Sequence, residues 1–95
     1  MNEDAGERAE KYIQNVERAL ENLTSTNLPT SITRRDLASV LDTVKRYVSD
    51  ARFYLQEGKT TTSLASISYA EGLLDAMKFL KIVNLSWQSK DYAQI

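Results

Sequence analysis

Hydrophobic residues recur along this chain at intervals of three and four, which is the spacing of amphipathic helices. Three such stretches predict helices over residues 5–23, 33–57 and 61–82. The stripe of the first helix contains Ala9, Tyr12, Ile13, Val16, Leu20 and Leu23. The second contains Leu37, Val40, Leu41, Val44, Val48, Ala51 and Leu55. The third contains Leu64, Ile67, Ala70, Leu74, Met77 and either Leu80 or Lys81, and Leu73 and Ala76 widen it. The pattern predicts one all-α domain over residues 1–95, an up-and-down three-helix bundle with a C-terminal extension at 83–95.

Turn and capping residues separate the three stretches. Gly58 lies where a left-handed residue can close the second helix. The hydroxyls of residues 60–62 are then expected to cap the third helix. Because this connection is short, the second and third helices should form a long antiparallel hairpin. Thr33 and Asp36 have the spacing of a capping box at the start of the second helix.

The first helix has two candidate caps, Asn2 and Asp4. Between the first two helices, residues 24–31 are rich in Ser, Thr, Asn and Pro and are expected to form a loop. Arg34 and Arg35 then stand at a helix start, where cations oppose the dipole. They are either an anion site or, as we favour, a solvated pair.

Folding the hairpin about its turn predicts side-chain neighbours. Gly72 should lie opposite Tyr47, where a missing Cβ would permit close approach. Tyr69 should come level with Asp50, so a phenol-to-carboxylate hydrogen bond is expected. Such contacts either set the register of the core or mark a ligand site, and we favour the former.

Asp75 should come near Val44 by the same pairing, within reach of Lys45 or Tyr47. It stands about two turns from Asp50 along the hairpin, too far for the two carboxylates to share a metal. Glu71, four residues before Asp75, is expected to be solvated.

Residues 50–58 and 68–76 also carry the patterns D-A-R-x-[FY]-L-x-x-G and S-Y-A-x-G-x-L-D-A. Over roughly residues 8–82 the chain resembles the DUF357 family, short archaeal helical proteins of uncharacterised function. The resemblance implies a small three-helix bundle and no known reaction, although similar domains are sometimes attached to nucleotidyltransferase-like domains. The chain departs from the family at Lys59 and Thr60, where an acidic and then an aromatic residue are usual. The candidate polar cluster comprises Asp50, Arg52, Tyr54, Tyr69, Gly72 and Asp75.

Composition excludes several kinds of chemistry. The chain has no cysteine and no histidine, so it has no disulfide, no thiolate and no imidazole base or metal ligand. Gly58-Lys59-Thr60 imitates a phosphate-binding loop, but the required earlier glycine position holds Phe53. We therefore predict no catalytic residue, no cofactor and no metal.

Charge and hydropathy argue against nucleic acid and membrane as partners. The net charge is −1, and no run approaches the ~20 apolar residues of a membrane span. Arg46, Arg52, Tyr47 and Tyr54 suggest a basic aromatic stripe, which Asp42, Asp50 and Glu57 interrupt. The N-terminus is acidic and polar, unlike a secretory signal. These features favour a cytoplasmic protein.

The tail at 83–95 contains unusually many large apolar residues, among them Trp87 and Tyr92. It either folds back over the bundle or docks on a partner, since such residues serve both as core clamps and as interface anchors. We expect a non-enzymatic interaction module that forms a homo-oligomer or binds a partner protein. The alternative is an accessory domain that binds nucleotide or nucleic acid.

Overall fold

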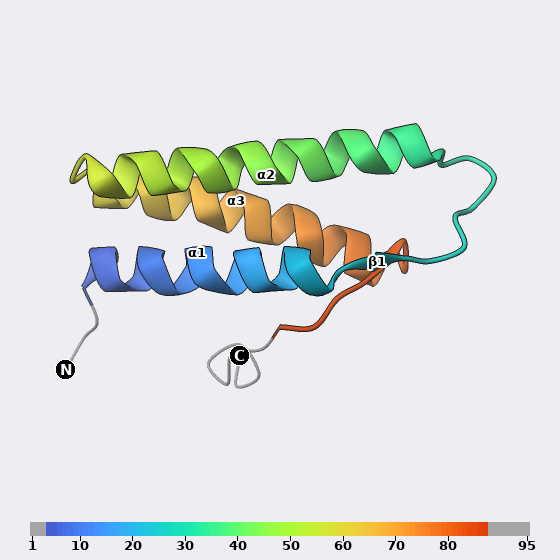
Figure 1. Ribbon diagram of the computed structural model, residues 1–95, viewed down its shortest axis with the longest axis horizontal. Coiled ribbons are helices and arrows are strands. Elements are labelled where there is room, and N and C mark those ends of the chain that lie inside the picture. The colour runs from blue at the N-terminus through green and yellow to red at the C-terminus, as the bar shows by residue number, and fades with distance from the viewer. Residues whose placement is uncertain (1–3, 88–95) are drawn as a thin grey trace.

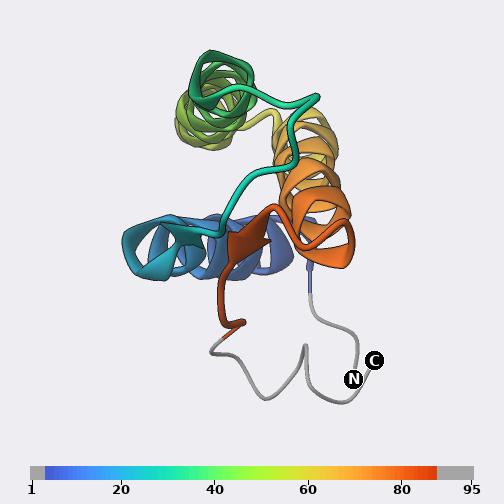
Figure 2. The ribbon, with the colours of Figure 1, turned by 90° about the vertical axis from the view of Figure 1, so that its right-hand side faces the viewer.

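The computed structural model describes residues 4–87 and contains three helices (Figure 1). These are α1 (Ala5–Asn22), α2 (Arg34–Gln56) and α3 (Thr60–Phe79). Two short strands, β1 (Thr24–Ser25) and β2 (Val83–Asn84), form an antiparallel pair. Seen from the end, α1 and α2 form one face and α3 lies behind them (Figure 2). The predicted all-α three-helix bundle is confirmed.

Two of the three helix starts are capped as predicted. The Asp4 carboxylate accepts a hydrogen bond from the Glu7 backbone N–H at 2.7 Å. Thr33 and Asp36 form a complete capping box, with reciprocal distances of 3.0 and 2.9 Å. These hydrogen bonds hold the pKa of the Asp36 carboxyl below its usual value.

The predicted threonine caps of α3 are absent. The N-cap residue is Lys59, and it makes no side-chain cap hydrogen bond. The helix begins one residue earlier than predicted, so the three threonines already belong to its first turn. The preceding hinge matches expectation, because Gly58 is left-handed with φ 77°.

The third helix ends at Phe79, three residues before the predicted end. Lys81 adopts a positive φ of 61° and turns the chain, so that Ile82 and Val83 become buried. Leu80, predicted to face the core, is 69% exposed. The physical reason is that the chain turns at Lys81, so that Ile82 and Val83 are buried instead of Leu80.

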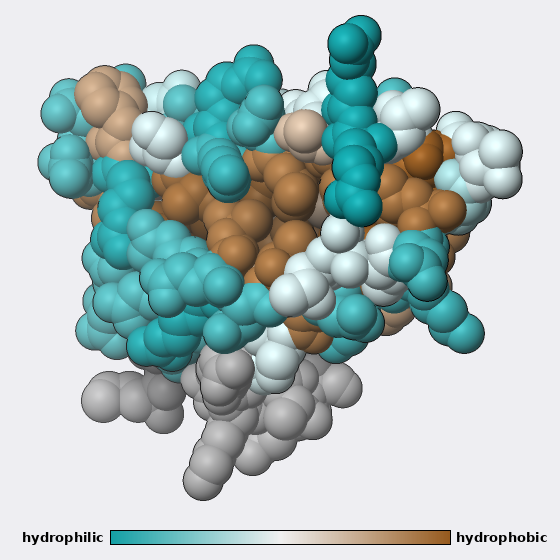
Figure 3. All heavy atoms as spheres, turned by 45° about the vertical axis from the view of Figure 1, so that its right-hand side comes forward, coloured by the Kyte–Doolittle hydropathy of each residue, from teal (hydrophilic) through white to brown (hydrophobic). Residues whose placement is uncertain are grey.

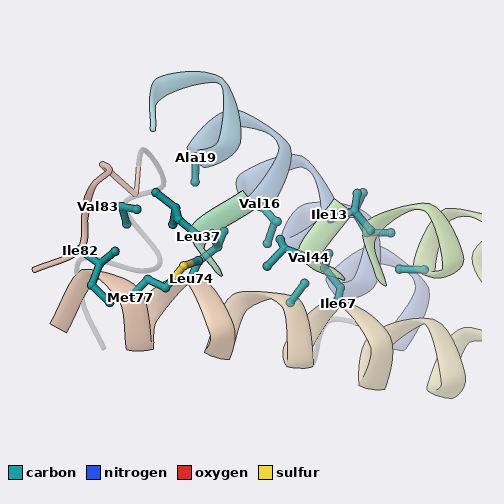
Figure 4. Packing of buried hydrophobic residues seen from close by; sticks show 13 residues of the cluster. Ile13, Val16, Ala19, Leu37, Val44, Ile67, Leu74, Met77, Ile82 and Val83 are labelled. Carbon is teal, nitrogen blue, oxygen red and sulfur yellow. The ribbon is translucent and has the colours of Figure 1, made fainter. Parts of the chain in front are cut away.

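The core follows the predicted stripes of all three helices (Figure 4). Its buried residues are Ile13, Val16, Ala19, Leu37, Val44, Val48, Ala51, Ile67, Ala70, Leu74, Met77, Ile82 and Val83. Ser63, which the stripes omitted, is fully buried and donates its hydroxyl hydrogen to the Ala51 carbonyl oxygen at 2.7 Å. That bond satisfies a hydroxyl that would otherwise be costly to bury.

Candidate functional site

The six residues of the predicted polar cluster do not meet at one place. Arg52 extends toward α1 and binds two carboxylates there. Its Nη1 lies 2.7 Å from Glu10 Oε2, and its Nη2 lies 2.9 Å from Glu17 Oε1. Hydrogen bonding to Glu17, and then to Glu10, raises the pKa of the Arg52 guanidinium. This arginine therefore joins α1 to α2.

Tyr69 does not bond to Asp50, although both lie in the described part of the chain. Its ring packs edge-on against Tyr47, with centroids 4.5 Å apart and planes at 60°. Tyr47 lies three residues before Asp50, so the hairpin register differs from the predicted one by nearly a turn. That shift leaves Asp50 exposed on the surface. Tyr54 packs against its neighbour Phe53, with ring centroids 5.6 Å apart.

Gly72 provides no close approach between helices, contrary to prediction. It is exposed on α3, and a Cβ added there would meet nothing within 4 Å. The expected contact with Tyr47 fails because Gly72 faces outward while Tyr69 occupies the seam with α2.

Asp75 bonds to the C-terminal segment instead of to Lys45 or Tyr47. The Trp87 Nε1–H donates to Asp75 Oδ1 at 2.8 Å. The hairpin argument placed Asp75 toward α2, whereas it lies on the other flank of α3. The described part of the tail thus folds back on its own bundle, and Tyr92 lies outside the described residues.

Glu71 is not solvated as predicted. Its Oε2 is buried and has no hydrogen-bond partner. Burial, and secondly the charge of Asp75, raises the pKa of the Glu71 carboxyl to about 7. Asn15 on α1 is only 2% exposed, and its Nδ2 is likewise without a partner. Nothing in the hydrophobic spacing indicated either residue.

The seam between α1 and α2 presents apolar surface. In Figure 3 hydrophobic atoms gather in a band between the upper helix, α2, and the lower helix, α1, with hydrophilic side chains above and below. Leu20 lies one turn after Glu17 on α1, and Leu41 lies on the same side of α2 as Arg52. Because Glu17 and Arg52 contact each other, Leu20 and Leu41 lie on the sides of the two helices that face each other. Both are only partly buried, as are Leu28 and Ile32 of the connecting loop.

The α1–α2 groove, defined by Leu20 and Leu41, has rims of opposite charge. The α1 rim carries Glu10, Glu17 and Glu21, and the α2 rim carries Arg34, Lys45 and Arg52. Arg52 closes one end of the groove. Further along, Lys45 and Glu21 lie level but form no ion pair.

The described residues provide no group of three acidic side chains able to hold a metal ion. None of the helices between residues 4 and 87 is long and apolar enough to span a bilayer. The basic aromatic stripe also lacks a common site, since Arg52 is bound by glutamates and Tyr47 packs on Tyr69.

The comparisons with known proteins agree with the fold. No curated protein and no solved structure matches the chain. The model of one family, described as a protein of unknown function (DUF357), matches residues 11–83. That match covers the three helices except the first turns of α1, together with the start of β2. The chain therefore belongs to the DUF357 family.

Proposed function

We propose that this chain is a non-enzymatic helical module that associates with a second copy of itself through the α1–α2 groove. The observation that carries the proposal is the apolar band between α1 and α2 (Figure 3). Apolar patches flanked by polar rims are typical of protein interaction surfaces. On this view the module works in the cytoplasm as an assembly element.

The two rims favour a second copy as the occupant. A two-fold axis parallel to the helices would set α1 of one copy over α2 of the other. Glu21 would then approach the partner's Lys45, and the same pair would form twice because such an interface is isologous. Opposite charges facing each other across an interface favour this docking over unrelated surfaces.

The proposed interface lies along the face that α1 and α2 form (Figure 1). A standard interface takes about 800 Å² from each partner.

A charge swap tests the proposal through the solution mass, measured by light scattering after gel filtration. Wild type should have twice the 10.8 kDa chain mass. Lys45→Glu should be monomeric, because it sets like charges against the partner's Glu21. The double variant Lys45→Glu with Glu21→Lys should recover the dimer. Lys78→Glu, an equal charge change at an exposed position on α3, should remain dimeric.

A dimer that survives Lys45→Glu unchanged would place the interface elsewhere. A wild-type chain that is monomeric would contradict self-association.

The alternative prediction, an accessory domain for nucleotide or nucleic acid, has weaker support. It relied on Arg46, Arg52, Tyr54 and Tyr69 acting together. Arg52 is engaged with two glutamates, and Tyr69 packs against Tyr47.

A further inference from the structure

The last turn of α3 exposes two consecutive large apolar side chains. Phe79 is 75% exposed and Leu80 is 69% exposed, the highest values among the large hydrophobic residues that the structure describes. Lys78 precedes them and Lys81 follows them. Both lysines are exposed, and neither forms an ion pair within residues 4–87. The α3 tip, defined as residues 78–81, therefore combines an apolar pair with a cation on each side.

Hydrogen bonds fix the backbone of the α3 tip. The Lys81 N–H donates to the Lys78 carbonyl oxygen at 2.9 Å. The Ile82 N–H donates to the Met77 carbonyl oxygen at the same distance. These two bonds form a Schellman turn with Lys81 in the left-handed position. The Thr26 hydroxyl donates to the Lys81 carbonyl oxygen at 2.7 Å, so the exposed pair stands on a backbone that is bonded on both sides.

The end of the bundle that holds the α3 tip is basic. The helices α1 and α3 end there and α2 begins there (Figure 1), and Figure 2 looks onto this end. Within one turn of these helix ends the chain has five cations, Arg18, Arg34, Arg35, Lys78 and Lys81. It has three carboxylates in the same turns, Glu21, Asp36 and Asp75. The connection at residues 23–33 has no charged side chain.

Two of these three carboxylates are already bound. Asp36 accepts the Thr33 backbone N–H at 2.9 Å in the capping box. Asp75 accepts the Trp87 indole N–H at 2.8 Å. The excess of positive charge at this end therefore exists although the whole chain has a net charge of −1.

Local helix chemistry explains only part of this arrangement. The dipole of α3 stabilises lysines at its C-terminus, which accounts for Lys78 and Lys81. The dipole of α2 opposes Arg34 and Arg35 at its N-terminus. Neither dipole gives a reason for the exposed apolar pair. A partner that supplies both negative charge and an apolar medium accounts for all three features.

We propose that this end of the bundle binds the surface of an anionic phospholipid bilayer. The apolar pair enters the boundary between headgroups and acyl chains, and the surrounding cations contact the lipid phosphates. A nucleic acid would also supply phosphates, and a base could stack on Phe79. It offers no comparable medium for Leu80, so the pair favours a bilayer.

The sequence argued against a membrane on two grounds, the net charge of the whole chain and the lack of a spanning run. Neither bears on one basic end that lies on a surface. The inference does not depend on the groove dimer, because each copy has its own α3 tip. In that dimer a two-fold axis parallel to the helices would direct both tips to the same side, so that both contact one bilayer.

Sedimentation of the full chain with vesicles tests the proposal. Vesicles of phosphatidylcholine alone should leave the protein in solution, whereas vesicles of equal parts phosphatidylcholine and phosphatidylglycerol should bind it. Binding should weaken as salt is added, because salt screens the cations. A chain that stays in solution with the anionic vesicles overturns the proposal. So does a chain that binds single-stranded RNA but no vesicle, since the cations would then serve nucleic acid.

Matched variants locate the contact. Lys81→Gln should weaken binding to the anionic vesicles by about fivefold, because one cation is lost. Lys59→Gln removes an exposed lysine at the other end of α3 and should bind like wild type. The double variant Phe79→Ser with Leu80→Ser should weaken binding by at least about tenfold. Phe53→Ser, an exposed aromatic near the end of α2, should have no effect.

Equal losses for Lys81→Gln and Lys59→Gln would overturn the proposal, as would a double serine variant that binds like wild type. Circular dichroism and the solution mass of each variant should match wild type, which separates lost lipid binding from lost folding or association. Should the double serine variant fail to fold, the comparison of the two lysine variants decides the matter.

Discussion

Arg52 is the residue that ties α1 to α2 by charge. The planar guanidinium of Arg52 binds Glu10 at 2.7 Å and Glu17 at 2.9 Å, so it holds one carboxylate toward each end of α1. All three side chains remain partly exposed, so the ion pairs are accessible to salt.

Replacing Arg52 with glutamine should lower the free energy of unfolding by about 1 kcal/mol, the upper range for partly exposed pairs. The loss should shrink in high salt, because screening already weakens the pairs in wild type. Urea unfolding at low and high ionic strength measures both effects. Arg46→Gln is the matched control, since Arg46 is exposed and forms no ion pair in the described structure. Equal losses for both variants would remove the special role of Arg52.

Glu71 predicts how stability depends on pH. Its folded pKa of about 7 lies above the usual 4.5, so between these values the folded chain holds a proton that the unfolded chain has lost. The free energy of unfolding must therefore fall as the pH rises through this window, and then level off.

Glu71→Gln should abolish that dependence. The variant should be more stable than wild type at about pH 8. The difference should disappear near about pH 4, where the Glu71 carboxyl of wild type is protonated in both the folded and the unfolded chain. Chemical unfolding at the two pH values tests the sign. A variant that is less stable than wild type at the higher pH contradicts the burial argument.

At the scale of elements, the two glycines of the hairpin have opposite roles. Gly58 ends α2 with φ 77°, a conformation that side chains resist. Gly72 lies inside α3 with open space where a Cβ would stand.

Gly72→Ala should raise the free energy of unfolding by about 1 kcal/mol, because alanine is the better helix former and nothing obstructs it. Gly58→Ala should lower it by about 1–2 kcal/mol, since alanine must adopt a left-handed backbone. Thermal unfolding of both variants gives the comparison. If Gly72→Ala unfolds more easily than wild type, the glycine must make room for a contact with another molecule, since nothing in this chain lies near its Cβ position.

The elements themselves could be predicted because local chemistry determines them. The capping box at Thr33 and the turn at Gly58 depend on residues only a few positions away. The end of α3 could not, because the left-handed residue that closes it is Lys81 and not the glycine that usually marks such a turn, although the bonds from Lys81 and Ile82 back to Lys78 and Met77 are local.

The predicted polar cluster failed for a different reason. Helix periodicity assigns residues to a face, but it does not fix how far two helices slide along each other. A shift of nearly one turn was enough to put Tyr69 on Tyr47 and leave Asp50 exposed. The contact between Trp87 and Asp75 further requires the chain to reverse after α3, which no spacing rule predicts.

For the whole molecule, the arrangement of the three helices explains where an interaction surface can exist. Packing α3 behind α1 and α2 leaves the α1–α2 groove on the broad face (Figures 2 and 3). Arg52 on the α2 rim pairs with Glu10 and Glu17 on the α1 rim within one molecule, whereas Lys45 and Glu21 do not pair and remain available to a second copy. Association should therefore weaken with salt.

The mass of the wild-type chain in solution, measured by light scattering over a range of concentrations, tests this view most directly. At low salt we expect twice the 10.8 kDa chain mass, falling toward one chain on dilution or as salt is added. A mass of 10.8 kDa at every concentration would contradict self-association through the groove.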